Sequence, residues 1–449
     1  MDLKKKSENS AKRPVVLADL FGKICSGNEP VTEILQKFRE GYLNTPREEH
    51  PALFETLIRR FETPRKAIEE DLRKVQATGD ADPAQWTRAM TELRRKIGSP
   101  RLKAFGAFMN LSGGLKFLLD FRADVLGAQR QAGTDLAPLD EDIAHLFDSW
   151  FQQGFLFLQE ITQDSPYRQI RFLMEHDLVH PMTSLEEMGT RLGEDRRCFS
   201  LFHRAMPEEP VVFIEVALTR GLARSIHDIL GSPGEGAPRL SRPDTAIFYS
   251  INNTQQGLAG LGLGKVLILQ VVDALKRGSP DIKTFATLSP IPGFREKYLQ
   301  RILEGGETRF ALNREKLEAF FPPKVREQFL KKAADGAAQG FNKTLAAVLS
   351  QPGWLEDPEY FQLLKKPLTD ITYFYLARER DPQGKPLNPV ANFHIGNGAT
   401  ISPRNVHFAA NRMKRGVEES CGMMVNYLYS STWLQQIGRT MHALLPRKT

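Results

Sequence analysis

The stretch DTAIFYSINNTQQGLAGLGLGKVLILQVVDALKRGSPDIKTFATLSPIPGF, residues 244–294, decides how the chain folds. Residues 246–250 are aromatic and β-branched, a composition typical of a buried strand. After a glycine-rich loop, apolar residues recur at helical spacing over 266–275, and residues 284–288 predict a second strand. The prolines of SPIPGF at 289–294 then predict a stiff turn that carries an exposed hydroxyl. This order of elements predicts the centre of an α/β domain.

The glycine-rich loop lies directly before the predicted helix. Its glycines let backbone amides approach a ligand closely, and a helix N terminus favours a pyrophosphate. The loop does not match a P-loop, because Lys265 is followed by Val266 rather than by Ser or Thr. It does not match a Rossmann fingerprint either, since the second strand ends in Leu288-Ser289 instead of an acid. The pattern resembles the acetyl-CoA loop of the GNAT acyltransferase fold, and spacing alone leaves a phosphate-binding loop and a tight structural turn equally open.

The composition is that of a globular protein with more than one domain. A chain of 449 residues is long enough for two or three domains, and 41% hydrophobic with 26% charged residues is ordinary. No apolar run approaches the ~18–20 residues that a membrane span needs. The net charge of +7 is modest, and no nucleic-acid-binding module is visible. We therefore expect a polyanionic small ligand, and neither nucleic acid nor membrane as a partner.

The cysteines and the N-terminal residues indicate the cellular compartment in which we expect the protein. Cys25, Cys198 and Cys421 are far apart and form no CxxC pair, which argues against a disulfide framework or structural zinc and favours a reducing compartment. Residues 1–14 lack the apolar segment of a secretory signal, and their acidic residues weaken a mitochondrial presequence. We expect a cytoplasmic protein. The histidines show no metal-ligand spacing, so no metal site is predicted.

Periodicity along the chain predicts a multidomain protein of α and α+β class. Residues 1–14 predict a disordered basic tail, and residues 15–178 an all-α helical bundle. Residues 179–449 predict a mixed-sheet domain, with a helical insertion around 297–376.

Within the mixed-sheet domain, apolar runs at 197–203 and 210–218 predict an antiparallel hairpin. Residues 389–401 and 420–429 predict two further strands, and residues 433–445 a terminal helix.

Four motifs together resemble malonyl-CoA decarboxylase: TQQGLAGLGLG at 254–264, LSPIPGF at 288–294, VANFHIGNGA at 390–399 and SCGMMVNYLY at 420–429. The resemblance implies a helical N-terminal domain used in oligomer assembly, as a dimer or tetramer, and a catalytic domain of GNAT fold. It also implies conversion of malonyl-CoA to acetyl-CoA and CO2, with no metal and no cofactor beyond the CoA thioester substrate.

The resemblance further implies site residues. Ser289 and His394 fall on the family's catalytic serine and histidine, and Ser250 and Tyr429 on positions implicated in the site. The segment implied to hold the CoA pyrophosphate comprises Ala259, Gly260, Leu261, Gly262, Leu263, Gly264 and Lys265. Some relatives carry an acid where this chain has Gly262, so no catalytic role of that acid is carried over.

The chemistry requires such residues. Loss of CO2 leaves a thioester enolate, which needs hydrogen-bond donors at its oxygen and a proton at its α-carbon. We hypothesise that His394 donates this proton, since histidine has an unperturbed pKa of ~6.5. Ser289 would bind the malonyl carboxylate or exchange a proton with His394, and Tyr429 and Ser250 would complete the polar shell. Taken singly, each has an ordinary structural interpretation: a serine before proline is usually a turn residue, a lone histidine is usually structural, and a buried tyrosine is usually core.

Two other functions remain open from the residues. The same fold and loop serve acyl-CoA N-acyltransferases, which need an amine acceptor site and usually a base. A non-catalytic acyl-CoA sensor would bind the thioester without turnover. The pairing of Ser289 in SPIPGF with His394 in NFH favours the decarboxylase. Preference for malonyl-CoA over methylmalonyl-CoA is not readable from the sequence.

Overall fold

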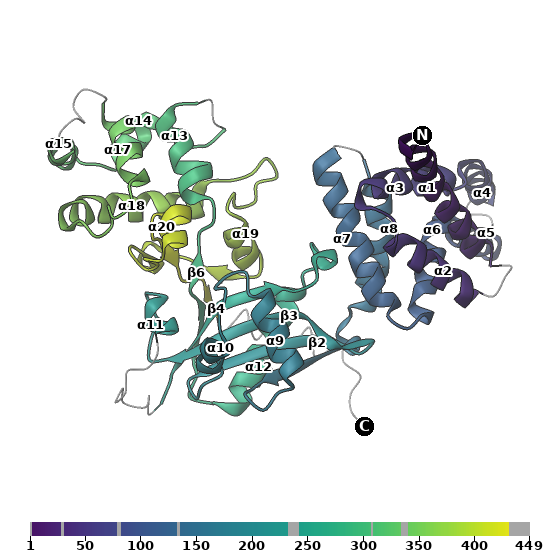
Figure 1. Cartoon of the computed structure of the whole chain (residues 1–449), viewed down its shortest axis with the longest axis horizontal. Coiled ribbons are helices and arrows are strands. Elements are labelled where there is room, and N and C mark those ends of the chain that lie inside the picture. The colour runs from purple at the N-terminus through teal and green to yellow at the C-terminus, as the bar shows by residue number, and fades with distance from the viewer. Residues whose placement is uncertain are drawn as a thin grey trace. The chain divides into compact units, whose positions relative to one another are not determined.

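The computed structural model forms two compact units (Figure 1). One unit comprises residues 1–157 with 201–212 and 253–263, and the other comprises 158–200, 213–252 and 264–449. The structure describes residues 2–27, 31–78, 82–132, 135–231, 242–306, 309–333 and 340–430.

The first unit is a bundle of helices around a core of phenylalanines. Its helices are α1 (Asp2–Ser26), α2 (Val31–Leu43), α3 (His50–Arg60), α4 (Arg65–Thr78), α5 (Pro83–Ile97), α6 (Pro100–Ala107), α7 (Gly114–Ala132) and α8 (Ala137–Trp150). Seven fully buried phenylalanines come from six of these helices and the turn after α6: Phe21, Phe38, Phe54, Phe105, Phe108, Phe121 and Phe147. Each buried ring removes a large apolar surface from water, which stabilises a small helical core.

Two features of this unit differ from the sequence-based expectation. Helix α1 includes residues 2–14, for which a disordered tail was predicted. This segment contains lysines, glutamate and alanine, all good helix formers, and its polarity alone does not distinguish a helix from a disordered tail. The predicted helical region also contains strand β1 (Leu156–Ile161), whose short run of consecutive apolar residues does not distinguish a strand from a helix.

A seven-stranded mixed sheet follows the helical bundle in sequence and supplies most of its strand residues to the second unit. Its order is β1-β2-β3-β4-β5-β10-β7. The strands after β1 are β2 (Arg196–His203), β3 (Met206–Thr219), β4 (Thr245–Asn253), β5 (Thr284–Thr287), β7 (Ala399–Thr400) and β10 (Leu428–Tyr429). The predicted hairpin is confirmed as the neighbouring strands β2 and β3. Strands β4 and β5 run parallel, whereas β10 pairs antiparallel with β5 and β7.

Helices and a small second sheet complete this unit. Helices α9 (Tyr167–His176) and α10 (Leu185–Arg191) follow β1, α11 (His227–Leu230) follows β3, and α12 (Leu263–Gly278) connects β4 to β5. The second sheet has the order β6-β9-β8, formed by β6 (Ser289–Pro290), β8 (Val406–His407) and β9 (Met424–Val425).

Between β6 and β7 the chain is helical, in the region where the insertion was expected. The helices are α13 (Gln300–Glu304), α14 (Arg314–Ala319), α15 (Pro323–Lys332), α17 (Phe341–Ser350) and α18 (Pro358–Arg378). They group together in Figure 1, with α17 packed on α13 and α15 packed on α18. Within the described residues, no helix is long and apolar enough to cross a membrane.

The C-terminal segment corrects one prediction. Residues 389–396 form helix α19 (Pro389–Gly396) instead of a strand, and β7 begins after it. The Asn388 side chain accepts hydrogen bonds from the amides of Val390 and Ala391, and Pro389 occupies the first helical turn. An Asn cap followed by proline is a helix-start signal, and here it outweighs the β-branched composition.

The segment 420–429, predicted as one strand, is also divided. Helix α20 (Lys414–Ser420) ends at Ser420, and the two short strands β9 and β10 follow. The predicted terminal helix at 433–445 lies outside the described residues.

Candidate active site

Strands β4 and β5 separate at their carboxyl ends. They pair in parallel from Thr245 opposite Thr284 to Phe248 opposite Thr287, and the Leu288 amide still donates to the Phe248 carbonyl. At Ser289 the chain leaves β4 and joins the second sheet by pairing with β9. Ligands of α/β sheets bind at the carboxyl ends of strands, particularly where neighbouring strands diverge. The candidate site begins at this point.

Three of the predicted residues come together beside this divergence. Ser289 Oγ lies 3.3 Å from His394 Nε2, and His394 Nδ1 lies 2.8 Å from the Tyr429 hydroxyl. Ser289 comes from β6, His394 from α19 and Tyr429 from β10, and each side chain is at most 5% exposed. The serine and the histidine are 105 residues apart in sequence. The imidazole therefore bridges two hydroxyl groups in a buried row.

The cap of α19 sets the position of His394. Asn388 is fully buried, and besides capping the helix it donates from Nδ2 to the Pro292 carbonyl at 3.2 Å. This bond ties the start of α19 to the SPIPGF turn that carries Ser289. The sequence reasoning missed Asn388, although an Asn-Pro pair just before a histidine-bearing segment was a readable cap signal.

Burial controls the protonation of His394. The imidazole stacks on the Tyr427 ring at a centroid distance of 4.7 Å, and burial lowers the pKa of His394 to about 3. Burial also raises the pKa of Tyr429 above its usual range. Both groups are therefore neutral near pH 7 in the ligand-free protein. The hypothesis from sequence used an ordinary histidine pKa, and the buried position changes that premise.

A further hydroxyl, that of Thr287, extends the row. Thr287 is fully buried at the end of β5, and Ser289 Oγ lies 2.9 Å from its Oγ1. The Tyr427 amide donates to the same Oγ1 at 3.1 Å, and Asn426 Nδ2 donates to the Thr287 carbonyl at 2.6 Å. Sequence reasoning missed Thr287. Its position two residues before Ser289 on an extended segment was the available signal, because alternate residues share a face.

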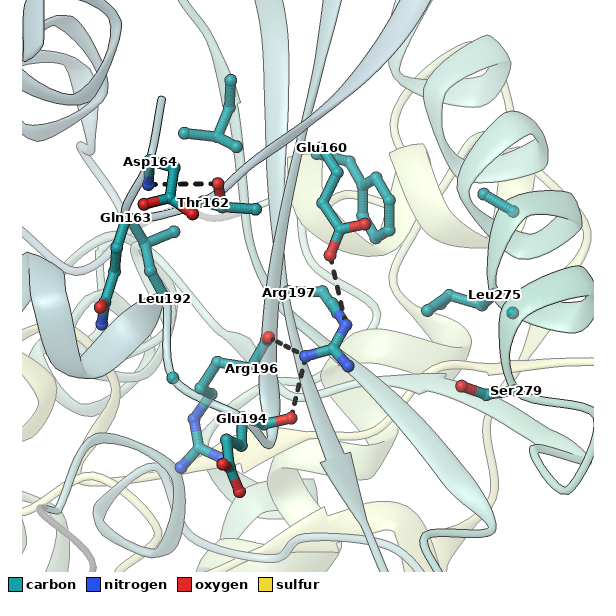
Figure 2. A pocket seen from close by; sticks show the side chains of 15 residues that line it. Glu160, Thr162, Gln163, Asp164, Leu192, Glu194, Arg196, Arg197, Leu275 and Ser279 are labelled. Atoms are coloured by element: carbon teal, nitrogen blue, oxygen red, sulfur yellow. Dashed lines mark hydrogen bonds and ion pairs between the residues drawn. The ribbon is translucent and has the colours of Figure 1, made fainter. Parts of the chain in front are cut away.

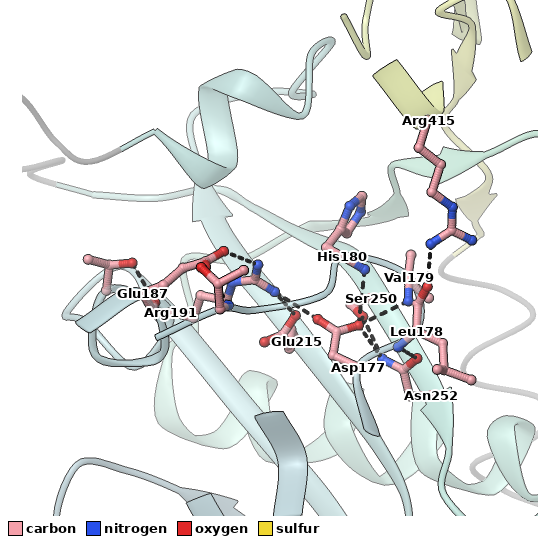
Figure 3. A network of polar contacts seen from close by, with 12 residues as sticks. Asp177, Leu178, Val179, His180, Glu187, Arg191, Glu215, Ser250, Asn252 and Arg415 are labelled. Atoms are coloured by element: carbon pink, nitrogen blue, oxygen red, sulfur yellow. Dashed lines mark hydrogen bonds and ion pairs between the residues drawn. The ribbon is translucent and has the colours of Figure 1, made fainter. Parts of the chain in front are cut away.

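The structure places Ser250 in a different network (Figure 3). Ser250 Oγ donates to Asp177 Oδ1 at 2.9 Å, and Asn252 Nδ2 donates to both Ser250 Oγ and Asp177 Oδ1, at 2.7 and 2.8 Å. No hydrogen bond joins Ser250 to Ser289, His394 or Tyr429 among the described residues. The Ser250 proton is thus held by a carboxylate.

This network ties the segment after α9 to the sheet. Arg191 Nη1 contacts Asp177 at 2.7 Å and Glu215 at 3.3 Å, and all three side chains are buried. Burial, together with the neighbouring Asp177 carboxylate, raises the pKa of Glu215 to about 8. Two carboxylates that share one arginine repel each other, so one of the two acids is readily protonated. We interpret this arrangement as structural.

The glycine-rich loop offers backbone donors ahead of α12. Gly260 and Gly262 are exposed with φ of +85° and +68°, a conformation that side chains disfavour. The amides of Ala259 and Leu261 already donate to the carbonyls of Gln256 and Leu258. No acceptor is found within the described part of the chain for the amides of Gly260 and Gly262, and the first turn of α12 adds further unpaired amides.

The other predicted loop residues differ in exposure. Leu263 is buried, and Gly264 and Lys265 are partly buried. A Cβ on Gly264 would lie 2.6 Å from Cζ of Phe393, the neighbour of His394. Gly264 therefore lets α12 pack against α19, and Leu263 contributes to the core.

A buried arginine of the helical unit holds the start of this loop. Arg122 Nη1 on α7 donates to the carbonyls of Gly257 and Ala259 at 2.6 and 3.1 Å, while its Nε donates to Asp140 at 2.6 Å. A Cβ on Gly257 would lie 2.0 Å from the Leu119 carbonyl oxygen, so the glycine permits close packing on α7. No sequence signal pointed to Arg122, because the contact spans 135 residues.

An open pocket of about 620 Å³ lies elsewhere in the second unit (Figure 2). Its lining comes from β1, β2, the loops beside them and the C-terminal end of α12, including an ion pair of Arg197 Nε with Glu160 at 3.2 Å. None of the predicted site residues lines it. Within the described residues, no group of three or more His, Cys, Asp or Glu side chains is placed to hold a metal ion.

Comparisons with known proteins agree with the motifs. Residues 154–443 match the malonyl-CoA decarboxylase C-terminal domain, and residues 61–151 match the malonyl-CoA decarboxylase N-terminal domain. The mitochondrial malonyl-CoA decarboxylase of Anser anser anser is 33% identical over 83% of this chain and 73% of its own length. That of Rattus norvegicus is 34% identical over 76% of this chain and 67% of its own length.

Solved structures show the same fold. The malonyl-CoA decarboxylase of Rhodopseudomonas palustris superimposes with a TM-score of 0.75 at 29% identity, and that of Agrobacterium vitis with 0.76 at 29% identity; each comparison covers 96% of both chains. The predicted order of a helical N-terminal region followed by a mixed-sheet region is confirmed. On these matches, the chain belongs to the malonyl-CoA decarboxylase family.

Proposed function

We propose that this chain converts malonyl-CoA to acetyl-CoA and CO2, and that the row Ser289–His394–Tyr429 delivers the proton to the enolate. Family membership supports the reaction. The observation that carries the residue assignment is the buried imidazole hydrogen-bonded at both nitrogens, to Ser289 Oγ and to the Tyr429 hydroxyl. Its position beside the diverging ends of β4 and β5 fits a thioester ligand entering there.

The glycine-rich loop is the proposed site of the CoA pyrophosphate. The amides of Gly260 and Gly262 and those of the first turn of α12 provide donors, and the helix dipole favours an anion. The amides of Ala259 and Leu261 contribute through the turn that they form. Lys265 adds a positive charge in the first turn of the same helix.

His394 is the proposed carrier of the proton. It is neutral in the ligand-free protein because burial lowers its pKa to about 3. A malonyl carboxylate bound nearby favours the charged imidazolium, since an opposite charge within a few ångström raises a histidine pKa. Substrate binding is therefore coupled to the uptake of one proton at Nε2, the nitrogen that faces Ser289.

The proposed step conserves atoms and charge. The carbon–carbon bond to the carboxylate breaks, CO2 leaves, and the electron pair forms the thioester enolate. Ser289 passes its hydroxyl proton to the α-carbon and receives the Nε2 proton of His394, which returns to the neutral form. Tyr429 accepts a hydrogen bond from Nδ1 throughout. One proton is consumed for each CO2 released.

Ser250 has a different proposed role. Because its proton is directed at Asp177, it is not free to donate to the substrate. We assign it to holding the end of β4 in place, next to the site.

The first experiment measures acetyl-CoA and CO2 from malonyl-CoA with the purified chain. His394→Ala and Ser289→Ala are expected to lose about 10²-fold or more in kcat, the scale of a lost acid–base group. His176→Ala is a matched control, since this partly buried histidine bonds only to the Phe172 carbonyl of its own helix, as far as the described residues show.

Other outcomes separate the alternatives. Binding of malonyl-CoA without CO2 release refutes the decarboxylase proposal. Acetyl transfer to an amine would then identify an N-acyltransferase, and binding without any turnover a sensor. Homo-oligomer assembly and a cytoplasmic location stay predictions, and curated relatives include proteins named as mitochondrial.

A further inference from the structure

We infer that Thr287 is a positioning residue that sets the direction of the hydrogen-bond row and thereby selects the tautomer of His394. The catalytic meaning of this inference rests on the proposed function. The tautomer itself is a property of the ligand-free protein and can be measured without turnover.

The contacts of Thr287 decide which group donates. Its Oγ1 accepts a hydrogen bond from the Tyr427 amide, which is always a donor. Its second contact is with Ser289 Oγ, at 2.9 Å, where either hydroxyl could supply the proton. Thr287 is fully buried.

The available acceptors favour a hydrogen bond donated by Thr287 to Ser289 over the reverse. If Ser289 donated to Thr287, the Thr287 proton would have no acceptor among the described residues, and a buried donor without a partner is unfavourable. If Thr287 donates to Ser289, every hydroxyl in this part of the row is satisfied. The Ser289 proton is then directed to His394 Nε2, at 3.3 Å.

The direction of these hydrogen bonds fixes the tautomer of His394. With Nε2 accepting from Ser289, the neutral imidazole carries its proton on Nδ1 and donates to the Tyr429 oxygen, at 2.8 Å. The lone pair of Nε2 is then the place where the substrate-coupled proton is taken up. When Nε2 becomes protonated, Ser289 Oγ accepts from both Thr287 and His394, and its own proton is free to move to the substrate.

The experiment is ¹⁵N NMR of the ligand-free chain with selectively labelled histidine. Nitrogen shifts distinguish the two neutral tautomers, and His394→Gln identifies the resonances. The wild type is expected to carry the proton on Nδ1. In Thr287→Val, which keeps the shape and removes the hydroxyl, we expect the Nε2-protonated form to gain about tenfold in population, the scale of one net hydrogen bond. Thr287→Ser should restore the wild-type spectrum.

Kinetics provide a second readout. Thr287→Val is expected to lower kcat about tenfold with KM nearly unchanged, and Thr287→Ser to recover it. Thr372→Val is the matched control, because this fully buried threonine donates to the Leu368 carbonyl within α18. Thermal denaturation of all variants identifies any general loss of stability. Thr287→Ala provides a second hydroxyl-free variant if Thr287→Val does not fold.

The outcomes are decisive. An Nε2-protonated His394 in the wild type overturns the inference, and so does a tautomer unchanged in the folded hydroxyl-free variant. A Thr287-dependent Nδ1 tautomer supports it, even in a chain that releases no CO2. In that case the proposed function fails while the assignment of Thr287 stands.

Discussion

Replacing Arg122 with methionine tests whether the helical unit holds the glycine-rich loop. Arg122 is 4% exposed and donates to two loop carbonyls and to Asp140. Methionine fills a similar volume but removes the charge and all three hydrogen bonds. The change therefore leaves the carbonyls of Gly257 and Ala259 and one carboxylate without their partner.

The magnitude follows from these contacts. Breaking a buried ion pair by removing one member costs about 3–5 kcal/mol. The Asp140 side chain is 24% exposed and can regain water, so we expect the lower end, about 3 kcal/mol of unfolding free energy. Released carbonyls also let Gly260 and Gly262 move, which should raise the KM for malonyl-CoA about tenfold while kcat changes less.

Arg101→Met is the matched control. Arg101 is equally buried, pairs with Asp142 at 2.7 Å and donates to the Phe61 carbonyl at 2.8 Å, but does not contact the glycine-rich loop. Urea denaturation should show similar destabilisation in both variants. Steady-state kinetics and calorimetric titration with CoA should distinguish the two variants, because only Arg122→Met loses the contact with the glycine-rich loop. If both variants raise KM equally, or neither does, the loop-anchoring role of Arg122 is wrong.

Three further predictions concern the site itself. Binding of a malonyl-CoA analogue that cannot lose CO2 should take up about one proton near pH 7, measured by calorimetry in buffers of different ionisation enthalpy, and none in His394→Ala; an equal uptake in both refutes the coupling. The pKa of His394 is lowered from 6.5 to about 3 by burial, so as pH falls the unfolded chain binds this proton before the folded chain does. The contribution of His394 to the free energy of unfolding is therefore fully present above pH 6.5 and is lost as pH falls. Wild type should lose about 2 kcal/mol more than His394→Gln between pH 7.5 and pH 5 in urea denaturation, and parallel curves contradict the shift. Gly264→Ala should displace Phe393, destabilise the fold by about 1–3 kcal/mol and lower kcat, whereas Gly278→Ala, with open space at its Cβ, should do neither.

Local patterns predicted those parts of the chain whose conformation depends on nearby residues. The strand, loop, helix and strand of residues 245–287 follow from period, glycine placement and β-branched composition, and all four elements are present. The helical insertion followed from the same kind of signal. The sequence did not predict helix α19 because Val390 and Phe393 are typical of a strand, whereas the cap at Asn388 starts a helix there.

Contacts between distant residues were beyond such reasoning. Motifs pointed to Ser289 and His394 as a pair, but the partners that orient them were invisible. Asn388 and Thr287 act through hydrogen bonds that depend on where β5, β9 and α19 meet. The sequence also could not show that Ser250 lies against Asp177, which is 73 residues away. A motif identifies reactive groups, while their protonation depends on the folded surroundings.

Burial explains why this arrangement suits decarboxylation. A histidine with an ordinary pKa would be partly charged before substrate arrives, and a buried charge without a partner is unfavourable. Here the imidazole is neutral between two hydroxyls, and burial lowers its pKa to about 3. The substrate brings the compensating negative charge, first as a carboxylate and then as an enolate. In the proposed mechanism the proton is acquired when the anion is present and consumed when CO2 has left, so the site returns to its neutral starting state after each turnover.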